Sequence, residues 1–268
     1  MSTAIDTAQS ISDERLMIEL HTLPLAALAG LVGGAMNALA GGGTFATMPA
    51  LIALGLPSPI ANATSNVALQ PGAMSAAWGF RDGLEPLGGI SIRILAAITF
   101  AGGLVGSLLL VITPTRTFDI IIPWLLLIAF LVIAFGKAAA DWLRTRTSIG
   151  LPTLMIAQSL LGLYGGYFGG GVGIMTTATY GLLAGIPPHK LMAPRTLMLA
   201  VANTAAAIIF ISFGMVRWWI CLPMLAGAVV GGWAGAHYGK KLSPRVIRLW
   251  TLLVTATTTA VFFMRAYG

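Results

Sequence analysis

The sequence predicts an all-α polytopic membrane protein made of two inverted repeats, each with about five helical segments. Three observations predict this fold: apolar runs of near-spanning length, a glycine-rich break that occurs twice, and an uneven distribution of Lys and Arg. Only 9% of the residues are charged and 57% are hydrophobic, whereas about 25% of a soluble domain is charged. Because the runs are continuous rather than alternating, they indicate membrane helices and not barrel strands.

The apolar segments follow a polar lead, residues 1–21, which lacks the basic start of a cleavable signal peptide. Segment 22–40 would form a helix about 28 Å long, enough to cross a bilayer, whereas segment 44–55 would reach only about 18 Å. The segments in order are 22–40, 44–55, 58–80, 90–112, 118–136, 151–171, 172–185, 189–213, 218–239 and 244–265. We therefore predict one transmembrane domain, residues 1–268, with repeats at 22–137 and 151–266 and one short or re-entrant segment in each.

The first break is Gly41-Gly42-Gly43, followed by Thr44, in the middle of apolar sequence. Each glycine destabilises a helix by about 1 kcal/mol relative to alanine, so the triplet is not an ordinary helix interior. Glycine does let the backbone bend, approach another helix closely, or expose its amides to a ligand. The same feature returns in the second half as Gly169-Gly170-Gly171, followed by Val172-Gly173. Two such breaks could form one site if they face each other.

Landmarks in the two halves recur at nearly constant spacing. Gly41–Gly43 and Gly169–Gly171 are 128 residues apart, Gly55-Leu56-Pro57 and Gly185-Ile186-Pro187 are 130 apart, Gly102-Gly103 and Gly231-Gly232 are 129 apart, and Thr113-Pro114 and Ser243-Pro244 are 130 apart. Four landmarks in one order and at one spacing predict two structural repeats. Glycines four residues apart, as at Gly102 and Gly106, also predict close helix packing.

The basic residues predict how the repeats are oriented. If each short segment crosses the membrane, or pairs with its predecessor as a re-entrant hairpin, four basic residues share one side and ten share the other. The first side holds Arg15, Arg116, Arg217 and Arg265; the second holds Arg81, Arg93, Lys137, Arg144, Arg146, Lys190, Lys240, Lys241, Arg245 and Arg248. The more basic side is expected to be cytoplasmic. An odd number of crossings per repeat makes the halves inverted, but the charges do not separate a hairpin from two crossings.

Several kinds of chemistry are not predicted. The carboxylates outside the N-terminal lead, Asp82, Glu85, Asp119 and Asp141, lie in loops or at segment ends, so no buried acid relay or carboxylate cation site is expected. The three histidines lack metal-ligand spacing and the single Cys221 forms no disulfide framework, so no cofactor or metal is expected. The formal charge of +7 lies in short connections, where it sets membrane orientation rather than binding nucleic acid.

Polar residues within the apolar segments cluster around the breaks and in the segments just after them. A buried amide without a partner costs about 1–3 kcal/mol, so each bonds a neighbouring helix or lines a wet cavity. Arg195 is the strongest signal, because a guanidinium inside an apolar segment is usually retained to meet an anion or a cluster of carbonyls. An arginine that reaches the surface beside Lys190 is the alternative.

Neutral donors, one arginine and two helix starts together suit a small anion, because a helix start carries partial positive charge and free amides. We expect Arg195 to pair with the anionic group, polar side chains to donate hydrogen bonds, and backbone amides near both breaks to contribute. The candidate substrate-binding residues are Asn37, Gly42, Gly43, Thr44, Thr64, Ser65, Asn66, Gln70, Gly170, Gly171, Arg195, Thr196 and Asn203.

These residues also carry a resemblance to a known family. The stretch Gly33-Gly34-Ala35-Met36-Asn37-Ala38-Leu39-Ala40-Gly41-Gly42-Gly43-Thr44-Phe45, with Pro49-Ala50-Leu51 and Asn62-Ala63-Thr64-Ser65-Asn66, resembles the sulfite exporter TauE/SafE family, also called toluene sulfonate uptake permeases. Gly169-Gly170-Gly171-Val172-Gly173 and Ala193-Pro194-Arg195-Thr196 are similar to the repeated signature of that family. The resemblance implies a multi-pass transporter of the bacterial inner membrane for sulfite, sulfoacetate or another organosulfonate. It does not give the solute or the direction.

We therefore expect a secondary transporter that moves a small sulfur-containing anion by alternating access around a site between the breaks. A passive anion channel or uniporter on the same scaffold is the alternative, since no motif indicates coupling. No enzyme is predicted, because an enzyme would need an intramembrane His/acid or Ser/His constellation. The expected partners are the anionic substrate and the lipid bilayer, with no nucleic acid, and the sequence allows a homodimer.

Overall fold

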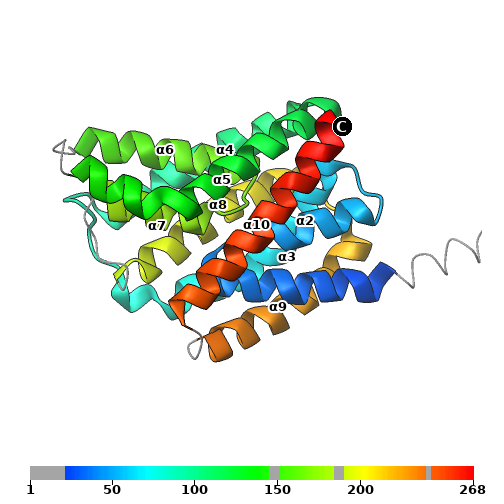
Figure 1. The fold of residues 1–268 in the computed structure, drawn as a ribbon, viewed down its shortest axis with the longest axis horizontal. Coiled ribbons are helices and arrows are strands. Elements are labelled where there is room, and N and C mark those ends of the chain that lie inside the picture. Colours follow the sequence, from blue (N-terminus) through cyan, green and yellow to red (C-terminus); the bar gives the residue numbers. More distant parts are fainter. Residues whose placement is uncertain (1–21, 145–150, 184–189, 240–242) are drawn as a thin grey trace, which may run out of the picture.

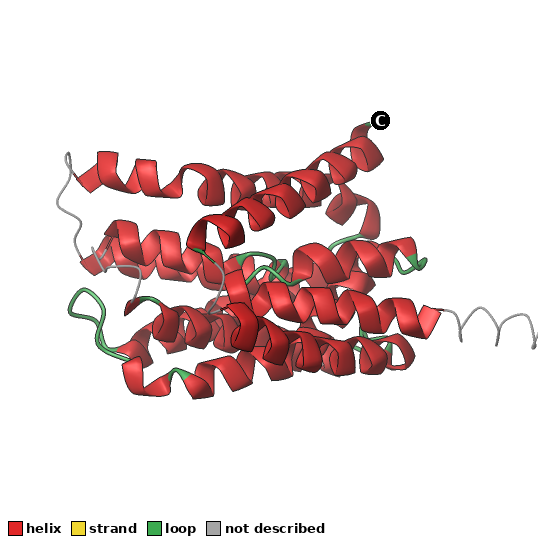
Figure 2. Cartoon of the chain, turned by 60° about the horizontal axis from the view of Figure 1, so that its bottom comes forward, coloured by secondary structure: helices red, strands yellow, loops and turns green. Residues whose placement is uncertain are grey.

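The computed structural model describes residues 22–144, 151–183, 190–239 and 243–268. These residues form helices joined by short loops, with one isolated β-bridge between Leu87 and Ile90 (Figure 2). The helices are Thr22–Ala40, α2 (Thr44–Ala53), α3 (Ser58–Gly79), the 3₁₀ turn η1 (Arg81–Gly83), α4 (Ile92–Ile112), α5 (Thr115–Arg144), α6 (Leu151–Tyr167), α7 (Val172–Leu183), α8 (Met192–Ser212), α9 (Trp218–Gly239) and α10 (Pro244–Tyr267). The predicted all-α class is confirmed.

Six helices of the described residues are long and apolar enough to cross a membrane. They are Thr22–Ala40, Ile92–Ile112, Thr115–Gly136, Met192–Ser212, Trp218–Tyr238 and Arg245–Tyr267. Two predicted boundaries differ from the structure. Helix α6 ends at Tyr167 and not at residue 171, because Gly169 and Gly171 have positive φ angles that leave the helical conformation. Helix α5 extends beyond the predicted 118–136 at both ends.

The two short helices each follow a glycine break, as predicted. Helix α2 folds back on the helix before it: Gly33 lies against Thr47 and Gly43, so that a side chain at Gly33 would have no room. Helix α7 likewise packs on α6, with Gly165 against Val172. Figure 1 places α2 toward the right of the view and α7 toward the left, so the two folded-back pairs enter the molecule from opposite ends.

The two halves are interlocked. Helix α4 of the first half packs on α6 and α8 of the second, while α9 of the second half packs on Thr22–Ala40 and α3 of the first. Helix α5 contacts α7, and α10 contacts α2. Two further pairs, α3 with α8 and α5 with α10, join equivalent helices of the two halves. Each of these helix–helix contacts is therefore matched by one in which the two halves exchange roles, whereas the contact of η1 with α8 has no such counterpart among the described elements.

Glycines allow the closest of these contacts. Gly102 and Gly106 of α4 lie directly against the backbone of α6 near Leu163, and Gly231 of α9 lies against the backbone of Leu31. A Cβ on Gly106 or Gly231 would overlap a carbonyl oxygen of the neighbouring helix. The predicted small-residue packing is thus present at both equivalent interfaces.

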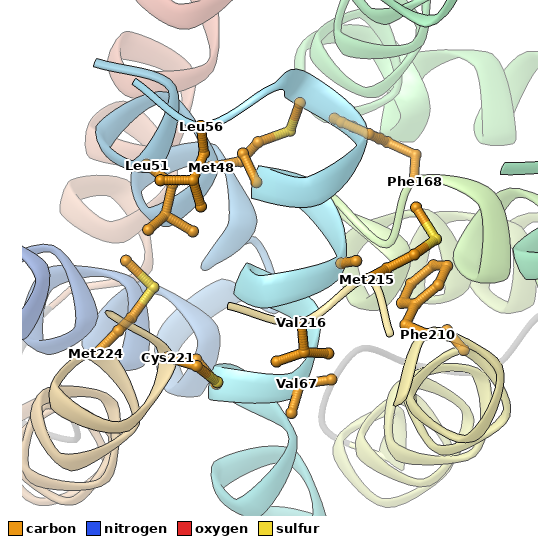
Figure 3. Packing of buried hydrophobic residues seen from close by; sticks show 14 of the residues in the cluster. Met48, Leu51, Leu56, Val67, Phe168, Phe210, Met215, Val216, Cys221 and Met224 are labelled. Atoms are coloured by element: carbon orange, nitrogen blue, oxygen red, sulfur yellow. The ribbon is translucent and has the colours of Figure 1, made fainter. Parts of the chain in front are cut away.

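Helix α3 runs through the centre of the apolar core (Figure 3). Met48 and Leu51 approach it from α2, Cys221 and Met224 from α9, and Phe210 from α8. Thirteen of the 22 residues of α3, from Ser58 to Ala73, are buried. A helix that is covered on every side must pair its polar side chains inside the protein, and α3 carries several.

Some predicted features lie outside the described residues. They are the N-terminal lead 1–21, the Gly185-Ile186-Pro187 landmark with the end of segment 172–185 and the start of 189–213, and the basic residues Arg15, Arg146, Lys240 and Lys241. For the ends of the described chain, Figure 1 shows that the first helix begins at the same end of the molecule as the C-terminus.

Candidate functional site

The two glycine breaks meet. A Cβ on Gly41 would lie 2.9 Å from Cα of Gly173, and a Cβ on Gly173 would lie 3.1 Å from Cα of Gly41. The first distance is one that Cβ atoms essentially never show and the second is tighter than nearly all of their contacts, so the approach requires glycine on both sides. It brings the turn before α2 against the first turn of α7, from opposite ends of the molecule.

The backbone of both breaks also needs glycine for its conformation. Gly41 has φ +77°, Gly169 has φ +74° and Gly171 has φ +77°, values that a residue with a side chain rarely adopts. The ring of Phe45 lies between the breaks and contacts Gly42 on one side and Gly170 and Gly171 on the other. The four predicted glycines therefore all lie at the contact between the two breaks: Gly42, Gly43, Gly170 and Gly171.

Arg195 lies beside this meeting point. It is the fourth residue of α8 and is 9% exposed. Its Cγ is 3.5 Å from where a Cβ on Gly173 would stand, and its Nη2 donates to the carbonyl of Ala38 across 3.5 Å. A guanidinium has five N–H donors, and this long contact is the one hydrogen bond that the described residues give it. The buried charge thus retains donors for a further partner.

The start of α2 is open toward the same region. No side chain caps it, since its N-cap residue is Gly43. Thr44 follows and is 7% exposed, and Asn37 lies against Gly43 with its Cβ 3.0 Å from where a Cβ on that glycine would stand. The N–H groups of Phe45 and Ala46 donate to the carbonyls of Gly42 and Gly43 (3.1 and 3.0 Å), which leaves the N–H of Thr44 and the partial positive charge of the helix start for a ligand.

Three amides form a row along one face of α3, at positions 62, 66 and 70, one helical turn apart. Asn62 Nδ2 donates to the carbonyl of Tyr167 (3.1 Å), at the end of α6. Asn66 Nδ2 donates to Oδ1 of Asn203 on α8 (3.3 Å). Gln70 Nε2 donates to the carbonyl of Ala200 (3.2 Å) and to Oγ1 of Thr204 (2.5 Å). We call Asn62, Asn66 and Gln70 the amide-oxygen row.

The side-chain oxygens of this row are left without hydrogen-bond partners. Four buried side-chain oxygens of the described residues have no hydrogen-bond partner in the structure. They are Asn62 Oδ1, Asn66 Oδ1 and Gln70 Oε1 of the row, and Oγ1 of Thr176 on α7. An unmade hydrogen bond at a buried polar atom costs about 1–3 kcal/mol. Four such atoms in the described residues call for a ligand, an ion or water that supplies donors or positive charge.

Three predicted site residues use their side chains elsewhere. Thr64 Oγ1 accepts from the backbone N–H of Arg217 (3.1 Å) before α9. Ser65 and Thr47 bond each other through their hydroxyls (2.5 Å), which ties α3 to α2. Thr196 Oγ1 donates back to carbonyls of its own helix.

The structure therefore divides the predicted site into parts. Arg195, Asn37, Thr44 and the glycines lie around the contact of the breaks, whereas Gln70 lies farther along α3. Asn66 and Asn203 lie between these parts, against Gly169 of the second break. Asn62 and Thr204 were not among the predicted residues. The recurrence of polar side chains every four residues at 58, 62, 66 and 70 is the signal that could have identified Asn62.

A second polar cluster is fully paired and lies apart from the breaks. Tyr180 of α7 donates to Oε1 of Gln158 (2.6 Å), whose Nε2 donates to Oγ1 of Thr99 (2.5 Å). All three side chains are buried. Because both ends of the Gln158 amide are paired, this cluster ties α4, α6 and α7 together and has no free group for a ligand.

The described residues contain no group of three or more His, Cys, Asp or Glu side chains that could hold a metal ion.

Comparison with known proteins gives a consistent assignment. The family model described as "Sulfite exporter TauE/SafE" matches residues 26–262. The probable membrane transporter protein YfcA of Escherichia coli strain K12 is 28% identical over 239 residues, covering 89% of this chain and 88% of the relative. A probable membrane transporter protein of Haemophilus influenzae is 27% identical over 243 residues, covering 89% of this chain and 95% of the relative. A probable membrane transporter protein of Sinorhizobium sp., ORF9, is 26% identical over 242 residues, with coverages of 89% and 91%. No solved structure matches the chain.

Proposed function

Because the chain belongs to the sulfite exporter TauE/SafE family and is a multi-pass transporter of the bacterial inner membrane, we propose that it moves a small sulfur-containing anion. Sulfite, sulfoacetate and other small organosulfonates are the solutes in question. The proposed mechanism is alternating access, in which the anion site opens to one face of the membrane and then to the other.

One observation carries the proposal: the two glycine breaks touch beside a buried arginine whose donors are largely unused. A sulfonate or sulfite group presents a compact set of acceptor oxygens and negative charge. A guanidinium matches such a group with paired N–H donors, and the start of α2 adds the N–H of Thr44 and partial positive charge. Asn37 and Thr44 lie close enough to the break to complete the site.

The packing of the halves supports the alternating-access part of the proposal. The contacts between the long helices of the two halves have exchanged counterparts, as a two-fold relation between repeats would require. Two repeats of opposite orientation can adopt each other's conformations, which gives an outward-open and an inward-open state of similar energy. The breaks are the proposed moving parts, since they are joined by backbone contact and not by hydrogen bonds that would have to break.

The basic residues give the proposed orientation of the protein in the membrane. In this proposal Arg81, Arg93, Lys190 and Arg248 lie on the cytoplasmic side, and Arg116, Arg217 and Arg265 lie on the periplasmic side. Helices α2 and α7 are re-entrant and reach the middle of the membrane from the periplasmic and the cytoplasmic side, respectively. The anion site then lies near the bilayer midplane, where the two breaks meet.

Binding is tested by thermal unfolding of the detergent-purified protein with sulfite, thiosulfate, sulfate and small sulfonates. A ligand at 100 times its Kd stabilises the folded state by about 2.7 kcal/mol, which raises Tm. Arg195→Gln should abolish the rise, and Arg195→Lys should weaken it, because lysine retains charge but lacks the planar fork. Arg93→Gln, which removes an exposed arginine, is the matched control and should respond like wild type. A full ligand-induced rise in Arg195→Gln would refute the site.

Transport in proteoliposomes separates a carrier from a passive channel or uniporter. A carrier that works by alternating access should saturate at low solute and should show counterflow, in which unlabelled solute inside drives uptake of labelled solute. A channel on the same scaffold would give flux that rises in proportion to the gradient, without counterflow. That result would leave anion binding intact and reject alternating access.

A further inference from the structure

The amide-oxygen row has a chemical character opposite to that of the anion site. Asn62 Nδ2 and Gln70 Nε2 donate to backbone carbonyls, those of Tyr167 and Ala200. A carbonyl only accepts hydrogen bonds, so the N–H side of each amide must face it and the oxygen must face away. The row therefore presents three buried acceptor oxygens that have no hydrogen-bond partner.

The surroundings of the row add negative potential. Asn62 bonds the last residue of α6, and Asn66 lies against Gly169 in the break that follows. The C-terminal end of a helix carries partial negative charge and leaves carbonyls without intrahelical partners. The ends of interrupted helices are the places where membrane transporters hold Na⁺ or H⁺. An anion would be repelled at this point.

A carboxylate lies at one end of the row. Ser58, one turn before Asn62 on α3, donates to Oδ1 of Asp119 on α5. Asp119 is half-buried, and the ion pairs of the described residues, Arg81–Asp82 and Lys190–Glu85, do not include it. Its charge is therefore not neutralised by a described Lys or Arg within 4 Å. Ser58, which is hydrogen-bonded to this carboxylate, thus lies one helical turn from the first amide of the row.

We propose that the amide-oxygen row binds an alkali cation, Na⁺, which reaches it past Asp119. Side chains one helical turn apart have Cβ atoms about 5–6 Å apart, so the oxygens of Asn62 and Asn66 can approach one ion together. Hard cations prefer such neutral and anionic oxygen ligands. Asn66 of the row lies against Gly169 at the beginning of the second break, and Arg195 lies against Gly173 just after it, so a cation and an anion bound together would attract each other. Coupling of Na⁺ to anion movement rests on the proposed function; binding of Na⁺ to the row does not.

The test is thermal unfolding of the purified full-length protein in Na⁺, K⁺ or choline chloride at equal ionic strength, with no sulfur anion present. The expected result is a Tm that rises with Na⁺, saturates, and exceeds the choline value by a few degrees. Equal Tm values in Na⁺ and choline would mean that the row holds water only, and would overturn the proposal. Because the anion is absent, this result is independent of the sulfonate experiment on Arg195.

Substitutions test whether Na⁺ binds at the amide-oxygen row. Asn62→Ala should lose the Na⁺-dependent rise, and Asn62→Leu, which keeps the side-chain volume without an amide oxygen, serves if the alanine variant does not fold. Asp119→Asn should raise the Na⁺ concentration needed for half of the shift several-fold. Gln158→Ala is the matched control: it removes a buried amide that is paired at both ends, so it should lower the basal Tm but keep the Na⁺ response. A Na⁺ response that survives in folded Asn62→Ala or in folded Asn62→Leu would overturn the assignment to the row.

Discussion

Gln70 donates a hydrogen bond to the backbone carbonyl of Ala200, the residue 130 positions further along the chain. The same spacing separates Thr113-Pro114 from Ser243-Pro244. Helices α3 and α8 therefore contact each other at positions that the predicted repeat spacing makes equivalent. In the two-fold relation proposed for the halves, this contact lies near the axis, where both copies would meet.

The contact between Gly41 and Gly173 should not tolerate a side chain. In Gly41→Ala, the new Cβ would stand 2.9 Å from Cα of Gly173, and alanine would have to adopt φ +77°. Overpacking and backbone strain each cost about 1–3 kcal/mol, so Tm should fall and transport should be lost. Gly72→Ala is the control, since Gly72 lies inside α3 and a Cβ added to it would meet no atom within 4 Å. That variant should keep transport and hold or raise Tm.

Thr64 and Ser65 should affect stability and not anion affinity. Thr64→Ala removes the acceptor of the Arg217 N–H, and Ser65→Ala removes the partner of Thr47. Thr64→Ala should lower the free energy of unfolding by about 1–3 kcal/mol, because it leaves the Arg217 N–H without its partner. Ser65→Ala should lower it by about 0.5–1.5 kcal/mol, because Thr47 keeps its hydrogen bond to the carbonyl of Gly43. Ligand-induced Tm shifts, measured relative to each variant's own baseline, should match wild type. A strong loss of anion affinity in Thr64→Ala would instead place Thr64 in the site.

Interhelical glycines should be sensitive to substitution in both halves of the chain. Gly231→Ala would push a Cβ into the carbonyl of Leu31, and Gly106→Ala would push one into the carbonyl of Leu163. Each should cost about 1–3 kcal/mol. At the neighbouring Gly232, an added Cβ would meet only the carbonyl oxygen of Gly34, at 3.8 Å. Gly232→Ala should therefore be neutral or stabilising in the same Tm measurement, and equal losses in Gly231→Ala and Gly232→Ala would contradict the packing.

The orientation can be read by labelling with a membrane-impermeant maleimide. Glu85→Cys should be protected in intact spheroplasts and should react in inverted vesicles, because that loop is proposed to be cytoplasmic. Thr115→Cys should react in the reverse pattern. The parent protein is the control, since its single Cys221 is fully buried. Labelling of Glu85→Cys from outside would reverse the orientation.

The helices and the paired glycine breaks could be predicted from the sequence because both depend on local properties of the chain. Apolar length sets the helices, and glycine triplets set the breaks, so Gly41–Gly43 and Gly169–Gly171 were identifiable without a structure. The all-α class and the family were predicted and are confirmed. The inverted orientation of the repeats stays a prediction.

The faces of α3 could not be assigned in the same way. Thr64, Ser65 and Asn66 are consecutive, and each position rotates by about 100° around the helix. The structure sends Thr64 toward α9, Ser65 toward α2 and Asn66 toward α8. Only the packing of neighbouring helices decides which of these sides meets the breaks, and sequence alone does not contain that packing. The same holds for Gln70, whose donors are engaged by α8.

The interlocked packing of the halves has a consequence for how the chain is made. When the first half has entered the membrane, the glycine face of α4 has no partner until α6 has been synthesised. The helix Thr22–Ala40 lacks its partner for longer, because α9 is synthesised later than α6. The early helices must then be held by lipid or by the insertion machinery through most of translation. A truncated chain ending before residue 151 should therefore be degraded rather than accumulate, whereas co-expression of the two halves should rescue both.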